Sequence, residues 1–138
     1  MKTFLLLTCC IFLLSCNDKV LVTEDCPSLV CTQEFRSVSI KFKDAAGQAV
    51  IVNNFSAIIK RTGKSTASYP TDASYFKGSY SVATDMDTKT LLPDGDTIDV
   101  SAVNPKTNQK KTAQFVVSGG KCACHIEKIS GPEEIVFD

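Results

Sequence analysis

Hydrophobic and polar residues alternate one by one in the segment that follows the first thirty-odd positions. Val38, Ile40 and Phe42 are separated by serine and lysine residues across 37–43. Strict alternation of this kind predicts a β-strand that buries one of its two faces. The sequence Asp-Ala-Ala-Gly at 44–47 then interrupts the pattern with residues that favour a turn.

Similar short runs recur along the chain, with turn residues about every ten positions. They are expected at 57–61, 78–84, 98–102, 113–117 and 122–126. Turns are expected at 62–64, 93–96 and 118–120, and a hairpin loop at 104–108. No window of helical length shows a 3.6-residue period. The pattern therefore indicates an all-β protein, either a sandwich or a barrel.

Two segments resemble a known family of β-sandwich domains. "VSIKFKDAAGQAV" is similar to the opening strand and turn of transthyretin-like and carboxypeptidase-regulatory-like domains, and "FKGSYSVATD" to their later Gly-x-Tyr-x-Val strand. The resemblance covers residues 33–118. It implies a seven-stranded antiparallel β-sandwich of Greek-key, prealbumin- or immunoglobulin-like type. The Pro often found after the turn glycine is replaced here by Gln48-Ala49.

That resemblance does not transfer an enzymatic activity. The urate-pathway hydrolases with this fold depend on several histidines and on a characteristic C-terminal tetrapeptide. This chain has one histidine and ends in Ile135-Val136-Phe137-Asp138.

The first sixteen residues, MKTFLLLTCCIFLLSC, are typical of an export signal. The uncharged run after Lys2 is shorter than the roughly 20 residues that a membrane-spanning helix needs. Its end, Leu13-Leu14-Ser15-Cys16, resembles the bacterial lipobox, which implies cleavage before Cys16 and attachment of diacylglycerol to its sulfur. An ordinary signal peptide or a short core helix with a chance cysteine is the alternative. We expect residues 1–15 to be a lipoprotein signal peptide and 16–32 a tether with disulfides.

Composition limits the remaining chain to one domain, expected at 33–138. The 15 basic and 15 acidic residues balance, and there is no basic stripe, so nucleic acid is not expected as a partner. No phosphate-binding loop, Gly-x-Ser-x-Gly or His-Glu-x-x-His motif is present, and we expect no enzymatic activity and no cofactor.

The cysteines predict a disulfide framework. Seven are present, and after loss of Cys9 and Cys10 and acylation of Cys16 an even set remains, namely Cys26, Cys31, Cys122 and Cys124. Outside the cytoplasm these are expected to be oxidised. On a strand, Cys122 and Cys124 would lie about 6.6 Å apart with parallel side chains, which disfavours a bond between them. We therefore expect Cys26 and Cys31 to pair crosswise with Cys122 and Cys124, in either of two connectivities.

Metal and redox chemistry are the alternatives for the Cys122-Ala123-Cys124-His125 motif. Zinc could be held by three cysteines and His125, or by four cysteines. A strand, however, would send His125 to the face opposite both thiols. A redox pair usually has two residues between its cysteines. His125 is instead expected to be a surface residue of the last strand.

Two further sets of residues could bind ligands. Asp85-Met86-Asp87 and Asp94-Gly95-Asp96 could hold calcium, although turn formation explains both pairs without an ion. Tyr69, Tyr75 and Tyr80 could form a platform for a glycan or peptide. The competing interpretation places Tyr80 and Phe76 in the core.

Taken together, these features predict a non-enzymatic, lipid-anchored β-sandwich of the bacterial cell envelope, with the outer membrane as the expected location. It would bind or support an envelope protein or glycan, with membrane lipid contacted through the acyl anchor. A carbohydrate-binding accessory lipoprotein is the first alternative. A small hydrolase that uses two carboxylates is the least favoured one.

Overall fold

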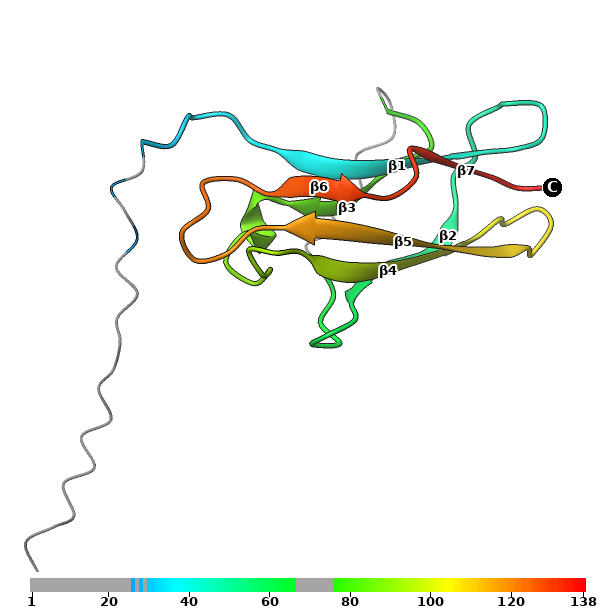
Figure 1. The fold of residues 1–138 in the computed structure, drawn as a ribbon. Coiled ribbons are helices and arrows are strands. Elements are labelled where there is room, and N and C mark those ends of the chain that lie inside the picture. The colour runs from blue at the N-terminus through cyan, green and yellow to red at the C-terminus, as the bar shows by residue number, and fades with distance from the viewer. Residues whose placement is uncertain (1–25, 27, 29, 67–75) are drawn as a thin grey trace, which may run out of the picture.

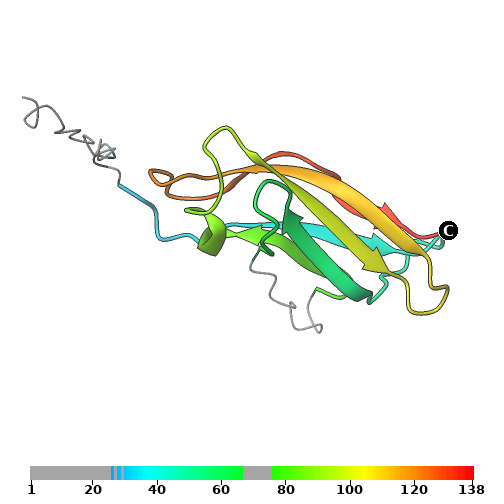
Figure 2. The ribbon, with the colours of Figure 1, turned by 90° about the horizontal axis from the view of Figure 1, so that it is seen from below.

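The computed structural model describes residues 26, 28, 30–66 and 76–138, and these residues form an essentially all-β fold. Two sheets pack as two layers (Figures 1 and 2). The first contains β3 (Ser79–Thr84), β1 (Ser37–Lys43) and β7 (Glu134–Val136), in that order. The second contains β2 (Asn53–Ile59), β4 (Asp96–Val103), β5 (Lys110–Ser118) and β6 (Glu127–Ser130). A short 3₁₀ helix, η1 (Asp85–Asp87), follows β3.

The alternation in the sequence explains the main strands and the core between them. In β1, Val38, Ile40 and Phe42 are buried while most of their polar neighbours are exposed. β4 shows the same two-residue period over its whole length. The core consists of apolar residues from both sheets and from the segment after β7. Its largest side chains include Phe42, Phe115, Phe137, Ile59, Ile98 and Val82.

One strand pair differs from the expected antiparallel arrangement. β7 pairs with β1 in parallel, with Phe42 opposite Ile135. The other strand pairs are antiparallel. The chain passes from β6 in one sheet to β7 in the other through 131–133 and continues in the same direction, so β7 reaches β1 without a reversal (Figure 1).

The prediction of a strand at 122–126 is also wrong. Residues 121–126 form turns and a loop between β5 and β6. Gly119 and Gly120 bend toward the segment after η1, where their N–H groups donate to Leu92 O (3.1 Å) and Thr88 O (2.7 Å). The apparent alternation had a different cause, because the cysteine side chains form disulfides and only Ile126 enters the core.

Thr66 links the two sheets along one side of the fold. Its backbone N–H donates to Ala57 O of β2 at 3.0 Å, and its hydroxyl donates to Val82 O of β3 at 2.6 Å. Thr66 is buried, so these bonds satisfy polar groups that edge strands would otherwise leave unpaired.

The two ends of the fold are formed by different segments of the chain. Residues 30–36, η1 and the loop 119–126 lie at one end, which we call the proximal end (Figure 1). The loops 44–52 and 104–109 and the C-terminal residue Asp138 lie at the opposite, distal end (Figures 1 and 2). Among the described residues, no helix has the length and apolar character needed to cross a membrane.

Candidate functional site

Two disulfides fasten the segment before β1 to the loop after β5. Cys26 is bonded to Cys122 and Cys31 to Cys124, with Cα atoms 5.2 and 5.4 Å apart. This is one of the two crosswise connectivities that the sequence allows. Because all four thiols are used in these bonds, none is free to act as a thiolate ligand for zinc.

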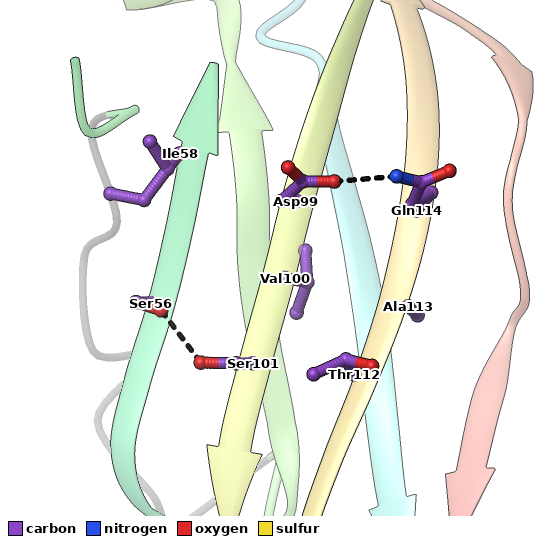
Figure 3. Close-up of a pocket in the computed structure, with 8 residues that line it drawn as sticks. All are labelled: Ser56, Ile58, Asp99, Val100, Ser101, Thr112, Ala113 and Gln114. Carbon is purple, nitrogen blue, oxygen red and sulfur yellow. Dashed lines mark hydrogen bonds between the residues drawn. The ribbon is translucent and has the colours of Figure 1, made fainter. Parts of the chain in front are cut away.

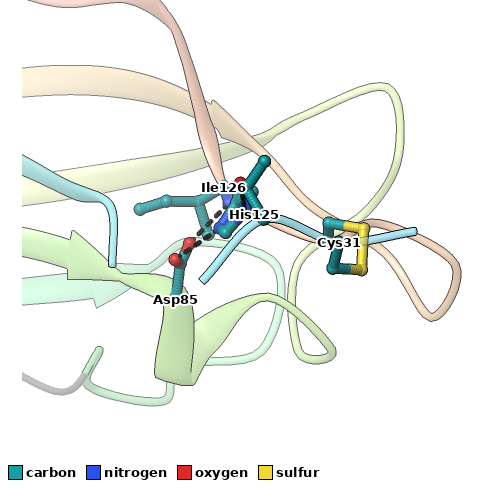
Figure 4. The surroundings of a disulfide bond; sticks show 6 residues. Cys31, Asp85, His125 and Ile126 are labelled. Atoms are coloured by element: carbon teal, nitrogen blue, oxygen red, sulfur yellow. Dashed lines mark hydrogen bonds and ion pairs between the residues drawn. A yellow bond between two sulfur atoms is a disulfide. The ribbon is translucent and has the colours of Figure 1, made fainter. Parts of the chain in front are cut away.

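His125 lies beside these bonds and is not the exposed strand residue expected from the sequence. Its side chain is 12% exposed, and its Nδ1 lies 2.7 Å from Asp85 Oδ2. Its Nε2 forms a 2.9 Å hydrogen bond with the hydroxyl of Thr32. Figure 4 shows His125 turned toward Asp85, next to the Cys31 disulfide. The expectation failed because it assumed a strand at a place where the chain forms a loop.

Asp85 lies at the centre of the contacts between the segment before β1, η1 and the loop after β5, which we call the proximal junction. Oδ1 accepts from Ile126 N at 2.9 Å, and Oδ2 accepts from Arg36 N at 2.8 Å as well as from His125. Burial raises the pKa of Asp85, but the hydrogen bonds from Arg36, His125 and Ile126 outweigh it and hold that pKa below its ordinary value. The ionised carboxylate therefore joins the segment before β1, η1 and the loop after β5.

Thr32, His125 and Asp85 have the hydroxyl–imidazole–carboxylate order of a hydrolase triad. Such a triad also needs N–H donors that face a developing oxyanion. The neighbouring N–H groups of Arg36 and Ile126 donate to Asp85 itself and are not free for that role. The bonds of Asp85 and His125 join three segments, which are the segment before β1, η1 and the loop after β5.

Three of the four aspartates considered for calcium, Asp85, Asp87 and Asp96, have other partners. Thr84 and Asp87 form a capping box around η1, in which Asp87 Oδ2 accepts from Thr84 N at 2.9 Å. Asp96 is buried and paired with Arg61 through two hydrogen bonds of 2.8 Å. The bond to Arg61, supported by Leu92 N, lowers the pKa of Asp96 against the opposing effect of burial. No group of three or more histidine, cysteine or acidic residues in the described part of the chain is arranged to hold a metal ion.

The expected tyrosine platform is described only in part, since Tyr69 and Tyr75 lie outside the described residues. Tyr80 packs against Phe42 and Phe55, with ring centroids 5.5 and 4.9 Å away. Its hydroxyl accepts from Val52 N at 2.9 Å. Phe76 was expected in the core under the competing interpretation, but it is 65% exposed. Tyr80 is therefore part of the packing between β3 and the segment leading into β2.

The outer face of the four-stranded sheet holds an open depression of about 800 Å³ across β2, β4 and β5 (Figure 3). We call it the sheet-face depression. One row across the strands consists of the hydroxyl residues Ser56, Ser101 and Thr112, which lie opposite one another in the pairing register. Ser56 and Ser101 share a hydrogen bond of 2.9 Å.

The next row of the sheet-face depression contains Ile58, Asp99 and Gln114. Gln114 Nε2 donates to Asp99 Oδ1 at 2.8 Å (Figure 3). The depression therefore offers hydroxyl, amide and carboxylate groups on a rigid sheet, with one apolar side chain at its edge. The depression was not predicted from the sequence, because alternation marks the outward positions of these strands only as the side that faces solvent.

Comparisons with known proteins identify no relative. No protein-family model matches the chain, and no curated protein and no solved structure matches it.

Proposed function

We propose that this protein is a non-enzymatic, lipid-anchored module of the bacterial cell envelope that binds another envelope component through the sheet-face depression. The observation that carries the proposal is the pair of disulfides that fix Cys26 and Cys31 at the proximal end. Disulfides persist on the oxidising side of a membrane. An acyl anchor at Cys16, ten residues before Cys26, would then attach near this end, while the outer face of the four-stranded sheet stays open to a partner.

The finer fold is part of the same proposal. The three- and four-stranded sheets and the central position of β1 in the first sheet are consistent with a Greek-key sandwich of the transthyretin-like or carboxypeptidase-regulatory-like type. The parallel pairing of β7 with β1 is a feature that such an assignment has to accommodate.

Acylation of Cys16 and location in the outer membrane are proposed from the lipobox-like sequence, which lies outside the described residues. The test is expression of the full precursor in a bacterium with labelled palmitate, followed by membrane fractionation. We expect label in the mature protein and its loss in Cys16→Ala. Label retained in Cys16→Ala, or an unlabelled wild-type protein, would contradict the proposal.

A glycan is the ligand that the sheet-face depression favours. Sugar hydroxyls both donate and accept hydrogen bonds, and the depression supplies acceptors on Asp99, donors on Gln114 and both on its serines and threonine. The absence of tryptophan removes the most common stacking residue for sugars, so polar contacts would carry the affinity.

A glycan array tests this second level of the proposal. The full chain is compared with Asp99→Asn and with Gln114→Ala, which change the depression without touching the core. We expect binding to at least one neutral envelope glycan and weaker binding by both variants. An array without hits would remove the glycan and leave an envelope protein as the partner, to be identified by crosslinking in cells.

A further inference from the structure

A second cavity, separate from the sheet-face depression, lies among the loops of the distal end. It has a volume of about 540 Å³ and is formed by the loop after β1, the turn before β3 and the loop between β4 and β5. We call it the distal pocket. Its apolar lining includes Ala49, Val50, Ile51 and Pro105, and its basic lining includes Lys77 and Lys106. Its volume falls in the range of small-molecule sites, and its lining combines apolar residues with charged and amide residues.

The loops around the distal pocket are held in place by their own hydrogen bonds. Asp44 Oδ1 accepts from Ala46 N at 3.0 Å and from Gln48 N at 2.8 Å, which fixes the loop after β1. In the loop between β4 and β5, Asn104 is buried, and its Oδ1 accepts from Lys106 N at 2.9 Å. A ligand would therefore meet walls that do not have to be ordered on binding.

Gly78 brings Lys77 against the apolar wall. A Cβ at Gly78, which has φ +77°, would lie 3.0 Å from both Ala49 Cβ and Phe42 O. This close approach is reinforced by the bonds from Phe42 N to Gly78 O (2.8 Å) and from Val50 N to Phe42 O (2.9 Å). The position of Lys77 beside Ala49 and Val50 is thus set by the backbone.

The lining of the distal pocket contains more basic than acidic side chains. Within the described part of the chain, neither Lys77 nor Lys106 forms an ion pair, whereas the nearby Lys43 is paired with Glu134. Asp44 is the acidic residue of the lining, and one of its oxygens is occupied by two backbone N–H groups. Ile51 is 50% exposed, so apolar surface remains accessible in the same lining as the two lysines.

We propose that the distal pocket binds a small amphiphilic anion, with its phosphate or carboxylate on Lys77 and Lys106 and its apolar part on Val50, Ile51 and Pro105. The proposal concerns a different site from the sheet-face depression and does not depend on the proposed function. Such a ligand could be a free metabolite or the headgroup region of a lipid. A pocket bounded by loops on several sides favours insertion of a single small group.

Calorimetric titration of the full chain with hexyl phosphate, hexanol and inorganic phosphate tests the proposal. We expect hexyl phosphate to bind at least about tenfold more tightly than either partial probe, because each partial probe lacks one half of the contacts. The Lys77→Gln/Lys106→Gln variant should weaken hexyl phosphate binding at least about tenfold. Ile51→Ser should weaken it without changing the weak binding of inorganic phosphate.

Lys89→Gln is the matched control, because Lys89 is exposed and lies outside the lining of the distal pocket. It should bind hexyl phosphate as the wild type does. A second titration with vesicles that contain an anionic lipid separates the two sources of the ligand. Binding of hexyl phosphate alone indicates a soluble ligand, and binding of both that is lost in the double variant indicates a lipid. Equal affinity for hexyl phosphate and hexanol, no binding of hexyl phosphate, or unchanged binding in the double variant would overturn the proposal.

Discussion

The ring of Phe115 occupies the space where any residue other than glycine at position 131 would place its Cβ. A Cβ at Gly131 would come within 3.0 Å of three atoms of that ring, and Gly131 has φ +136°. Phe115 is fully buried. The contact lets the chain cross closely over the core as it passes from β6 to β7.

Gly131→Ala should therefore lower the free energy of unfolding by about 3 kcal/mol, from backbone strain and overpacking together. Gly47→Ala is the control, since Gly47 also has positive φ (+75°) but no atom within 4 Å of its Cβ position. It should cost only about 1 kcal/mol. Urea unfolding of both variants measures the difference, and equal losses would show that the contact with Phe115 is unimportant.

Asp85 should make the protein less stable in acid. Because the folded protein lowers the pKa of Asp85 below its unfolded value, folding favours the ionised form. The stabilisation is complete above the unfolded pKa and is lost as the pH falls through the folded pKa. We expect Asp85→Asn to lower the free energy of unfolding at about pH 6 and to flatten its decline between about pH 5 and pH 2.

Asp94→Asn is the control for that experiment, because Asp94 is exposed. Asp96 and Asp138 also have lowered pKa values, so some acid sensitivity should remain in Asp85→Asn. A decline as steep in Asp85→Asn as in the wild type would show that the carboxylate does not stabilise the junction.

The pair of Arg61 and Asp96 should matter more than an exposed ion pair. Asp96 is 3% exposed and Arg61 43% exposed in their side chains, so removal of Arg61 leaves a buried carboxylate whose remaining hydrogen-bond donor among the described residues is Leu92 N. We expect Arg61→Ala to cost about 1–2 kcal/mol. Lys43→Ala, which breaks the more exposed pair with Glu134, should cost less than about 1 kcal/mol. Equal costs in denaturant unfolding would contradict this difference.

The disulfide connectivity can be read directly by peptide mapping without reduction. We expect peptides that join Cys26 to Cys122 and Cys31 to Cys124. Each bond closes a long loop, with separations of 96 and 93 residues, so loss of one bond by paired serine substitution should cost about 2–4 kcal/mol. Peptides that join Cys26 to Cys31, or four free thiols in the folded protein, would contradict the structure.

Tyr80 should act through packing and its hydroxyl bond. Tyr80→Phe keeps the ring contacts with Phe42 and Phe55 and removes the acceptor for Val52 N. We expect a loss of about 1 kcal/mol in the free energy of unfolding and no change in ligand binding at either proposed site. A change in glycan binding would indicate that Tyr80 contributes to the binding surface.

The sequence predicted the elements whose signal is local. Alternation located β1, β4 and most of β5, because each buries one face and exposes the other. It failed at 122–126, where the cysteines repeat with the period of a strand but are placed by their covalent bonds. It also missed the parallel pairing of β7, whose three residues are too few for a periodic signal.

The proximal junction and the two proposed binding sites depend on contacts that no local sequence pattern records. Asp85 and His125 are 40 positions apart, and neither has a neighbour in the sequence that identifies the other. Thr84 and Asp87 do form a recognisable capping motif, and it could have indicated the start of η1. Lys77 and Lys106 of the distal pocket are 29 positions apart, and they line one cavity because the turn before β3 packs against the loop after β1 beside the loop between β4 and β5.

The two disulfides also decide how the domain responds to mechanical tension. If the chain is pulled from its N-terminal side, the load enters at Cys26 and Cys31 and passes covalently to Cys122 and Cys124. From there it reaches β5 and β6 in one sheet as well as β1 in the other. The strain is then shared between both layers, so β1 is not peeled away alone, and the domain should resist unfolding under such a load.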